Sequence, residues 1–286
     1  VQMCFLPGYV VLGMAGVSGG LIQAFCLSFV LSLVINHLAV LALSAAGLYG
    51  LPALAALVCA EAGVLGWLHM AGRRAGLLGE WRTEKKRMAA WARRCGRPGG
   101  WVALLVAVLF GKVLLDFAVL SWQSIGQIFV QYDAVVSWNP WAQAWAAGHA
   151  PTRTGHYPQL IPTVLSLPYV FMGGAKFQFF SRWFMSLFPL ALLMMQADMA
   201  LRRGRLVYLL GAFVTGALLL YFFDHQYLVD GYVDLASAVM GFAAFYALFL
   251  ARWSVQAGQK KKLAALACVL AGGCALTKQS GLVVAA

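Results

Sequence analysis

The sequence has few charged residues, and carboxylates are the scarcest of them. Asp, Glu, Lys and Arg together make up 10% of the 286 residues, and only nine residues are acidic. An ordinary soluble domain carries about 25% charged residues. Hydrophobic residues make up 62% of the chain, and its mean hydropathy is +0.80. A soluble globule of this composition could not cover its surface with polar groups, so we predict an integral membrane protein.

The chain also lacks the cysteine patterns of zinc sites and disulfide frameworks. Its six cysteines form no CxxC or CxxH spacing, which structural zinc sites commonly use. None of them lies in a segment that we place outside the cell, where disulfides form. The sequence therefore indicates neither a structural zinc ion nor a disulfide-stapled fold.

The net charge of +12 is concentrated in three basic groups. Nine of the 21 Lys and Arg residues lie within Arg73–Arg97, and smaller groups lie at Arg202–Arg205 and Arg252–Lys262. Each group separates two apolar runs, which is the pattern of cytoplasmic loops under the positive-inside rule. Binding to nucleic acid is therefore the weaker interpretation, and anionic membrane lipids are the partners that we expect for these loops.

Long apolar runs supply the predicted membrane helices, since a helix needs about 20 predominantly apolar residues to cross a bilayer. We predict an all-α, polytopic transmembrane fold with spans over Leu21–Ala46, Leu51–Met70, Trp101–Trp122, Phe177–Leu201, Leu206–Phe223, Leu235–Ala251 and Leu263–Ala286. The piece before them forms either a short interfacial helix or the end of another span. The sequence begins at Val1 rather than at Met and stops inside an apolar run, so we expect further sequence at both ends.

Residues 123–175 lie on the outer side in this topology, and their middle part predicts a short surface helix. Asn139 is a favourable N-cap, and the proline after it suits the first helical position. Gly148 can end the helix. Trp141 and Trp145 are four residues apart and therefore share one face. Such an aromatic face is typical of a helix that lies in the membrane interface.

The next apolar segment, Pro158–Gly173, is short and is interrupted by Pro162 and Pro168. Its 16 residues would reach roughly 24 Å as a continuous helix, which is less than the roughly 30 Å of a hydrocarbon core. A crossing here would also move the basic group at Arg202 to the outer side. We therefore predict a second interfacial or re-entrant helix.

The few carboxylates are the most informative candidates for chemistry. Asp133 is the only acid between residues 123 and 175, and it follows shortly after a predicted span. By position alone, the simplest interpretation is a solvated loop aspartate. Lys112 and Asp116 lie one helical turn apart within a span, and we favour a structural ion pair there. An ionisable pair at membrane depth is nevertheless also a functional candidate.

A series of short motifs follows in a fixed order after Asp133. They are Trp141-Ala-Gln-Ala-Trp-Ala-Ala-Gly148-His-Ala-Pro151, Tyr157-Pro158, Phe171-Met-Gly173, Arg182, Gly231-Tyr-Val-Asp234 and Thr277-Lys278. This order resembles the GT-C superfamily of membrane glycosyltransferases, and by layout most closely the aminoarabinose transferases that act on lipid A and the protein O-mannosyltransferases. The resemblance covers about Trp101 to Ala286. It divides the chain into N-terminal membrane helices with a basic loop (1–100) and a GT-C-like catalytic module (101–286).

The resemblance implies a base and several phosphate contacts. Asp133 matches the family's first-loop acid and would be the catalytic base. Arg182, Lys278 and His156 match positions that would face the phosphate of a donor lipid. Lys278 would do so from within the last span, and a snorkelling lysine is the alternative for this residue.

The resemblance also implies two further substrate contacts and one candidate metal ligand. Asp234 would shape the site or orient the acceptor. Tyr157 stands in the substrate-binding segment where the family often has Lys or Pro before the proline. His156 would be the ligand if a divalent metal ion is bound, and a solvated histidine is the alternative. The family often has Asp-Glu where this chain has Asp133-Ala134, which removes one carboxylate from such a metal site.

The chemistry of sugar transfer fits this set of residues. Transfer from a polyprenyl phosphate sugar needs a base for the proton of the acceptor hydroxyl and cations for the leaving phosphate. We therefore predict an inverting glycosyltransferase on the outer face of a bacterial inner membrane, acting on a glycan, lipid or protein acceptor. The alternative is a transporter or flippase for a polyprenyl-linked lipid, which would place its ionisable groups near the membrane midplane.

Overall fold

The computed structural model describes residues 2–17, 19–72, 77–95, 100–174, 178–223 and 225–285. Within these ranges the regular elements are all helices, as predicted. In chain order they are α1 (Gln2–Met14), α2 (Leu21–Ala45), α3 (Leu51–Met70), α4 (Leu77–Cys95), α5 (Trp101–Gln123), the π-helix η1 (Ala134–Trp138), α6 (Asn139–Ala146), α7 (Leu160–Phe171), α8 (Phe179–Met185), α9 (Leu187–Arg203), α10 (Leu206–Tyr221), α11 (His225–Val229), α12 (Val233–Trp253), α13 (Ala257–Thr277), the 3-10 helix η2 (Gln279–Gly281) and α14 (Leu282–Ala285).

Among the described residues, five helical stretches are long and apolar enough to cross a membrane. They are α2, α3, α5, the stretch Phe180–Arg203 and α12. The predicted span at α10 has only 16 residues, and the one at α13 carries Lys260–Lys262 near its start. The architecture is that of an all-α membrane protein.

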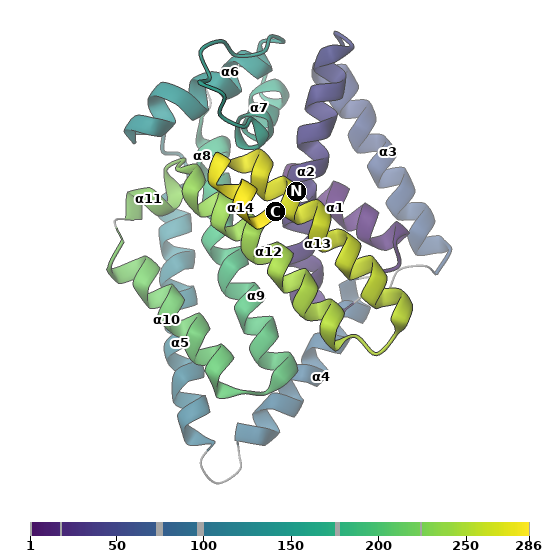
Figure 1. The fold of residues 1–286 in the computed structure, drawn as a ribbon, viewed down its shortest axis with the longest axis vertical. Helices are drawn as coiled ribbons and strands as arrows, with labels where there is room; N and C mark the ends of the chain where they lie inside the picture. The colour runs from purple at the N-terminus through teal and green to yellow at the C-terminus, as the bar shows by residue number, and fades with distance from the viewer. Residues whose placement is uncertain are drawn as a thin grey trace.

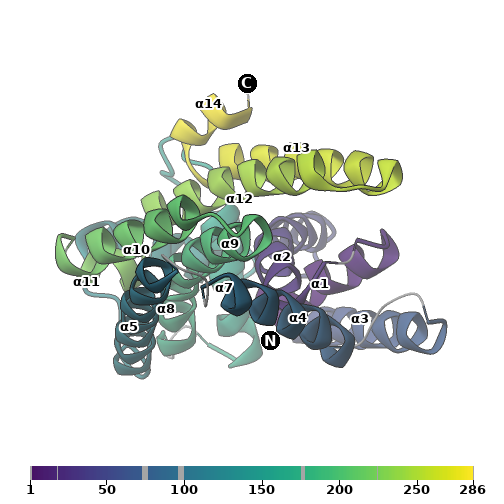
Figure 2. The same cartoon turned by 90° about the horizontal axis from the view of Figure 1, so that it is seen from below.

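Helices α2, α9 and α12 form the centre of the bundle. Phe29 of α2 packs edge-on against Phe188 of α9, with ring centroids 5.2 Å apart, and Tyr246 of α12 is fully buried. Figure 1 shows α6 and α7 gathered at one end of the bundle, while α4 and the α9–α10 turn lie at the other. Figure 2, viewed from that second end, shows α4 lying across the bundle, where it contacts α2 and α9.

The predicted basic loop is largely helical, because α4 covers most of it. Glu84 is buried against the bundle, and Arg87 Nη1 lies 3.6 Å from Asp198 Oδ1 of α9. Glu84 and Arg87 lie on one face of α4, and the same helical spacing includes Glu80 before them and Trp91 after them. The many charged residues of the segment obscured this 3.6-residue period in the sequence. Three arginines of the predicted loop, Arg73, Arg74 and Arg97, lie outside the described residues.

The short helix of the first outer segment begins earlier than predicted. Helical backbone starts near Asp133, and η1 leads directly into α6. The prediction that Asn139 caps the helix is therefore wrong. Its side chain is instead buried and accepts a hydrogen bond from the Tyr169 hydroxyl of α7. Gly148 does end the helix, with a φ of +83° that favours glycine.

Helix α7 is short, as predicted, and it lies inside the protein. Its 12 residues reach about 18 Å, too short for a crossing. Ten of them are buried, and the helix contacts α2, α6, α8 and α13. Most of its surface therefore faces protein instead of lipid headgroups.

The last predicted span ends before its expected boundary. Helix α13 stops at Thr277, and Lys278 adopts an extended backbone with φ −153° and ψ 152°. The chain then folds back so closely that a Cβ on Gly281 would lie 2.1 Å from the Cys274 carbonyl oxygen. The prediction that Lys278 lies within a span is therefore wrong, since it follows the end of a helix.

Candidate functional site

Two loops that are about 100 residues apart in sequence meet at the end of the bundle opposite α4. Asp230, in the turn before α12, is fully buried. Its carboxylate accepts hydrogen bonds from the backbone N–H groups of Val130, at 3.1 Å, and Gln131, at 2.8 Å. These bonds fix the segment before Asp133 against the segment before α12.

Gly231 allows the two loops to approach this closely. Its φ is +94°, a conformation that L side chains rarely adopt. A Cβ at this position would lie 2.8 Å from Ala134 Cβ and 2.8 Å from Phe129 Cε1. Glycine is therefore required both by the backbone conformation and by the space that the first loop leaves.

Asp133 is exposed at this junction and lies near Tyr232. Tyr232 donates a hydrogen bond to Gln131 Oε1 at 3.4 Å. Partial desolvation raises the pKa of Tyr232, and the negative charges of Asp133, Asp230 and Asp234 raise it further. One phenol thus lies within the field of three carboxylates, two of which, Asp133 and Asp234, are exposed.

Lys278 supplies a cation beside this group of acids. Its ammonium pairs with the Asp234 carboxylate in the first turn of α12. The Lys278 side chain is 27% exposed and that of Asp234 is 64% exposed. The pair is accessible to solvent, and pairs of this kind contribute roughly 0–1 kcal/mol.

Arg182 of α8 is buried. Its Nε donates to Asp230 Oδ1 at 2.7 Å, and its Nη1 donates to Gln127 Oε1 at 2.6 Å and to the Ser124 carbonyl at 3.3 Å. The guanidinium therefore ties α8 to both loops.

His156 and Tyr157 lie in the loop that precedes α7. His156 is exposed with a φ of +64°, and its carbonyl accepts a bond from Gln279 Nε2 at 3.5 Å. This contact brings the His156 loop to the segment that follows Lys278. Tyr157 packs edge-on against Trp138, with ring centroids 5.5 Å apart.

A metal ion gains no support from this geometry. Within the described ranges, no group of three or more His, Cys, Asp or Glu side chains could hold one. Such a group is the usual minimum for a protein-bound transition metal. The residues present do not fit the divalent ion considered for His156.

The structure thus brings Asp133, Asp234 and Lys278 to one end of the bundle. The sequence-based prediction missed Asp230 and Tyr232, which join the loops and lie among the acids. The Asp230-Gly231 dipeptide is a typical turn signal, but its burial depends on a partner loop far away in sequence.

Comparison with protein-family models, with curated proteins and with solved structures finds no match to this chain.

Proposed function

We propose that the chain is an inverting glycosyltransferase that moves a sugar from a polyprenyl phosphate donor to an acceptor hydroxyl. The proposal rests on one arrangement: the exposed acids Asp133 and Asp234 both act on the Tyr232 phenol, and Asp234 pairs with the cation Lys278. This junction lies at the end of the bundle opposite the basic groups. Under the positive-inside rule that end faces away from the cytoplasm.

In the proposed reaction, Asp133 accepts the proton of the acceptor hydroxyl while the acceptor oxygen bonds to C1 of the sugar. The bond between C1 and the phosphate oxygen breaks in the same step, and its electron pair leaves with the polyprenyl phosphate. This single displacement inverts the configuration at C1. General-base assistance of this kind typically contributes 10²–10⁴-fold.

Lys278 stabilises the negative charge that develops on the leaving phosphate. Its present partner, Asp234, is accessible, so a phosphate oxygen can replace the carboxylate at small cost in free energy. Asp234, released from the pair, then accepts a hydrogen bond from a sugar or acceptor hydroxyl.

Arg182 acts in this scheme as a positioning residue. Three hydrogen bonds already engage its guanidinium with Asp230, Gln127 and Ser124. It is buried, and through these bonds it holds the two loops together. We therefore assign the phosphate contact to Lys278 first.

A transporter is the second candidate, and one observation favours it. Lys112 Nζ lies 2.6 Å from Asp116 Oδ2 in the middle of α5, and the Tyr221 hydroxyl donates to the same carboxylate at 2.6 Å. The Lys112 side chain is 63% exposed. An accessible ionisable group within a candidate span is a feature of transport pathways.

Reconstitution of the full chain in proteoliposomes distinguishes the two candidates. A panel of polyprenyl phosphate sugars is supplied together with hydroxyl acceptors. A transferase releases free polyprenyl phosphate and forms a glycosylated product in proportion. Movement of intact donor lipid between leaflets without release of polyprenyl phosphate would contradict the proposal and favour the transporter.

A further inference from the structure

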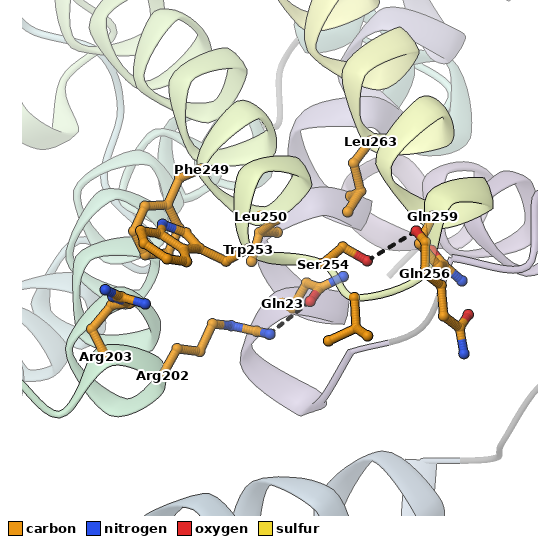
Figure 3. A pocket seen from close by; sticks show the side chains of 11 residues that line it. Gln23, Arg202, Arg203, Phe249, Leu250, Trp253, Ser254, Gln256, Gln259 and Leu263 are labelled. Atoms are coloured by element: carbon orange, nitrogen blue, oxygen red, sulfur yellow. Dashed lines mark hydrogen bonds between the residues drawn. The ribbon is translucent and has the colours of Figure 1, made fainter.

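A separate cavity of about 440 Å³ lies at the basic end of the bundle. Figure 3 shows that its lining comes from the ends of α9 and α12, the turn between α12 and α13, the first turns of α13, and the start of α2. Its polar lining includes Arg202, Arg203, Ser254 and Gln256, and its apolar wall includes Phe249 and Leu263. None of these residues belongs to the site at the opposite end.

The two arginines of the cavity differ in their electrostatic environment. Arg202 Nε pairs with the buried Asp198 carboxylate, and its Nη2 donates to Gln23 Oε1 at 2.6 Å. Arg203 forms no ion pair with any described residue, and its Nε has no hydrogen-bond partner among them. One guanidinium is therefore neutralised and the other is not.

Trp253 holds Arg203 in place. The Arg203 Cζ lies 3.4 Å from the centroid of the Trp253 ring, as in a cation–π contact. Stacking on the ring leaves the N–H groups at the edge of the guanidinium plane, where they can bind an anion in a bidentate fashion. The position of the Arg203 guanidinium is therefore fixed before a ligand binds.

The surroundings of the cavity favour an anion. The two acids nearest to Arg202 already have cationic partners. Arg87 of α4 lies 3.7 Å from Glu84 and 3.6 Å from Asp198, and Asp198 also pairs with Arg202. Arg252 and Lys260–Lys262 are exposed and directly adjoin the lining residues Trp253 and Gln259 in sequence, so they add positive charge to this end of the protein. Helix α13 starts at the cavity, and its N-cap residue Gln256 makes no side-chain capping bond, so its N-terminal partial charge is available to an anion.

We propose that this cavity binds a phosphate group, with Arg203 as its main ligand. The apolar wall suits the acyl chains of a phospholipid, and the guanidinium fork suits two oxygens of its phosphate. A free phosphate offers the same oxygens without acyl chains. The cavity distinguishes these two sources only through its apolar wall.

The test measures binding to the purified full chain in detergent with three probes: phosphatidylglycerol, inorganic phosphate and diacylglycerol. Arg203→Gln should weaken binding of the phosphate-bearing probe at least roughly ten-fold, the change expected for the loss of a charge-assisted hydrogen bond. Arg205→Gln is the matched control. It removes the same charge from an exposed residue two positions away that does not line the cavity, and it should change affinity less than about two-fold.

The three probes identify the source of the phosphate. Binding of phosphatidylglycerol alone indicates a lipid site, and binding of inorganic phosphate with similar dependence on Arg203 indicates a site for free phosphate. Equal binding of diacylglycerol, equal effects of the two arginine variants, or binding of no probe would overturn the proposal. If Arg203→Gln does not fold, Gln256→Ala removes a polar group from the other side of the cavity and should weaken phosphate binding several-fold.

Discussion

Asp230 should be the most sensitive carboxylate of the chain to substitution, although the proposed chemistry does not involve it. Its side chain is 0% exposed and accepts bonds from Arg182 Nε at 2.7 Å and from the Gln131 N–H at 2.8 Å. Asp230→Asn retains one acceptor but removes the charge, and it leaves a buried guanidinium without its counter-ion. Breaking a buried ion pair in this way costs about 3–5 kcal/mol.

The free energy of unfolding is measured by steric trapping of the full chain in bicelles. We expect Asp230→Asn to lower it by about 3–5 kcal/mol. Asp133→Asn is the matched control, because it makes the same chemical change at an exposed position in the neighbouring loop. It should change stability by no more than about 0.5 kcal/mol.

A double-mutant cycle isolates the pair. Arg182→Met alone should also be destabilising, since it leaves the Asp230 carboxylate without its cation. The double variant should be less destabilised than the sum of the two single variants, by roughly 0.5–3 kcal/mol. Equal stability of Asp230→Asn and Asp133→Asn, or strict additivity in the cycle, would refute the view that this pair joins the loops.

Gly231→Ala should destabilise the chain by more than the roughly 1–3 kcal/mol of backbone strain alone. Gly126→Ala, which has a φ of +81° and open space around its Cβ, should show only the strain, and equal losses would contradict the close approach of the loops. Lys278→Gln should raise the KM for the donor lipid roughly ten-fold with little effect on stability, and an unchanged KM would remove Lys278 from the site. Cysteines introduced at Thr154 and Arg205 on a cysteine-free background should react with an impermeant thiol reagent from outside and from inside respectively, and the reverse pattern would invert the topology.

Composition and periodicity were sufficient to predict the class of the fold. The apolar runs predicted the membrane helices because hydrocarbon requires apolar side chains over a fixed length. The two prolines and the short length of the Pro158–Gly173 segment correctly indicated a short helix. The break at Lys278 was missed because most residues that follow are apolar, and the return of the chain depends on contact between Gly281 and the α13 backbone.

The candidate site was only partly predictable for a similar reason. Asp133 stands out because it is the only acid in a long loop. Its place at the junction of the two loops depends on Asp230, which binds backbone groups about 100 residues away. Local sequence patterns contain no information about a contact of this kind. Asn139 illustrates the same limit, because its partner, Tyr169, determines its role instead of its own preference for a helix start.

The most direct test of the proposed activity is the rate of sugar transfer by Asp133→Asn in the full chain. The substitution keeps the size of the side chain but removes its ability to accept a proton near neutral pH. We expect the rate to fall by roughly 10²–10⁴-fold, while binding of the donor lipid and the amount of folded protein stay unchanged. Asp116→Asn, in the exposed pair of α5, should transfer at the rate of the unmodified chain. Transfer by Asp133→Asn at that same rate would show that Asp133 is a solvated loop residue and would contradict the proposed mechanism.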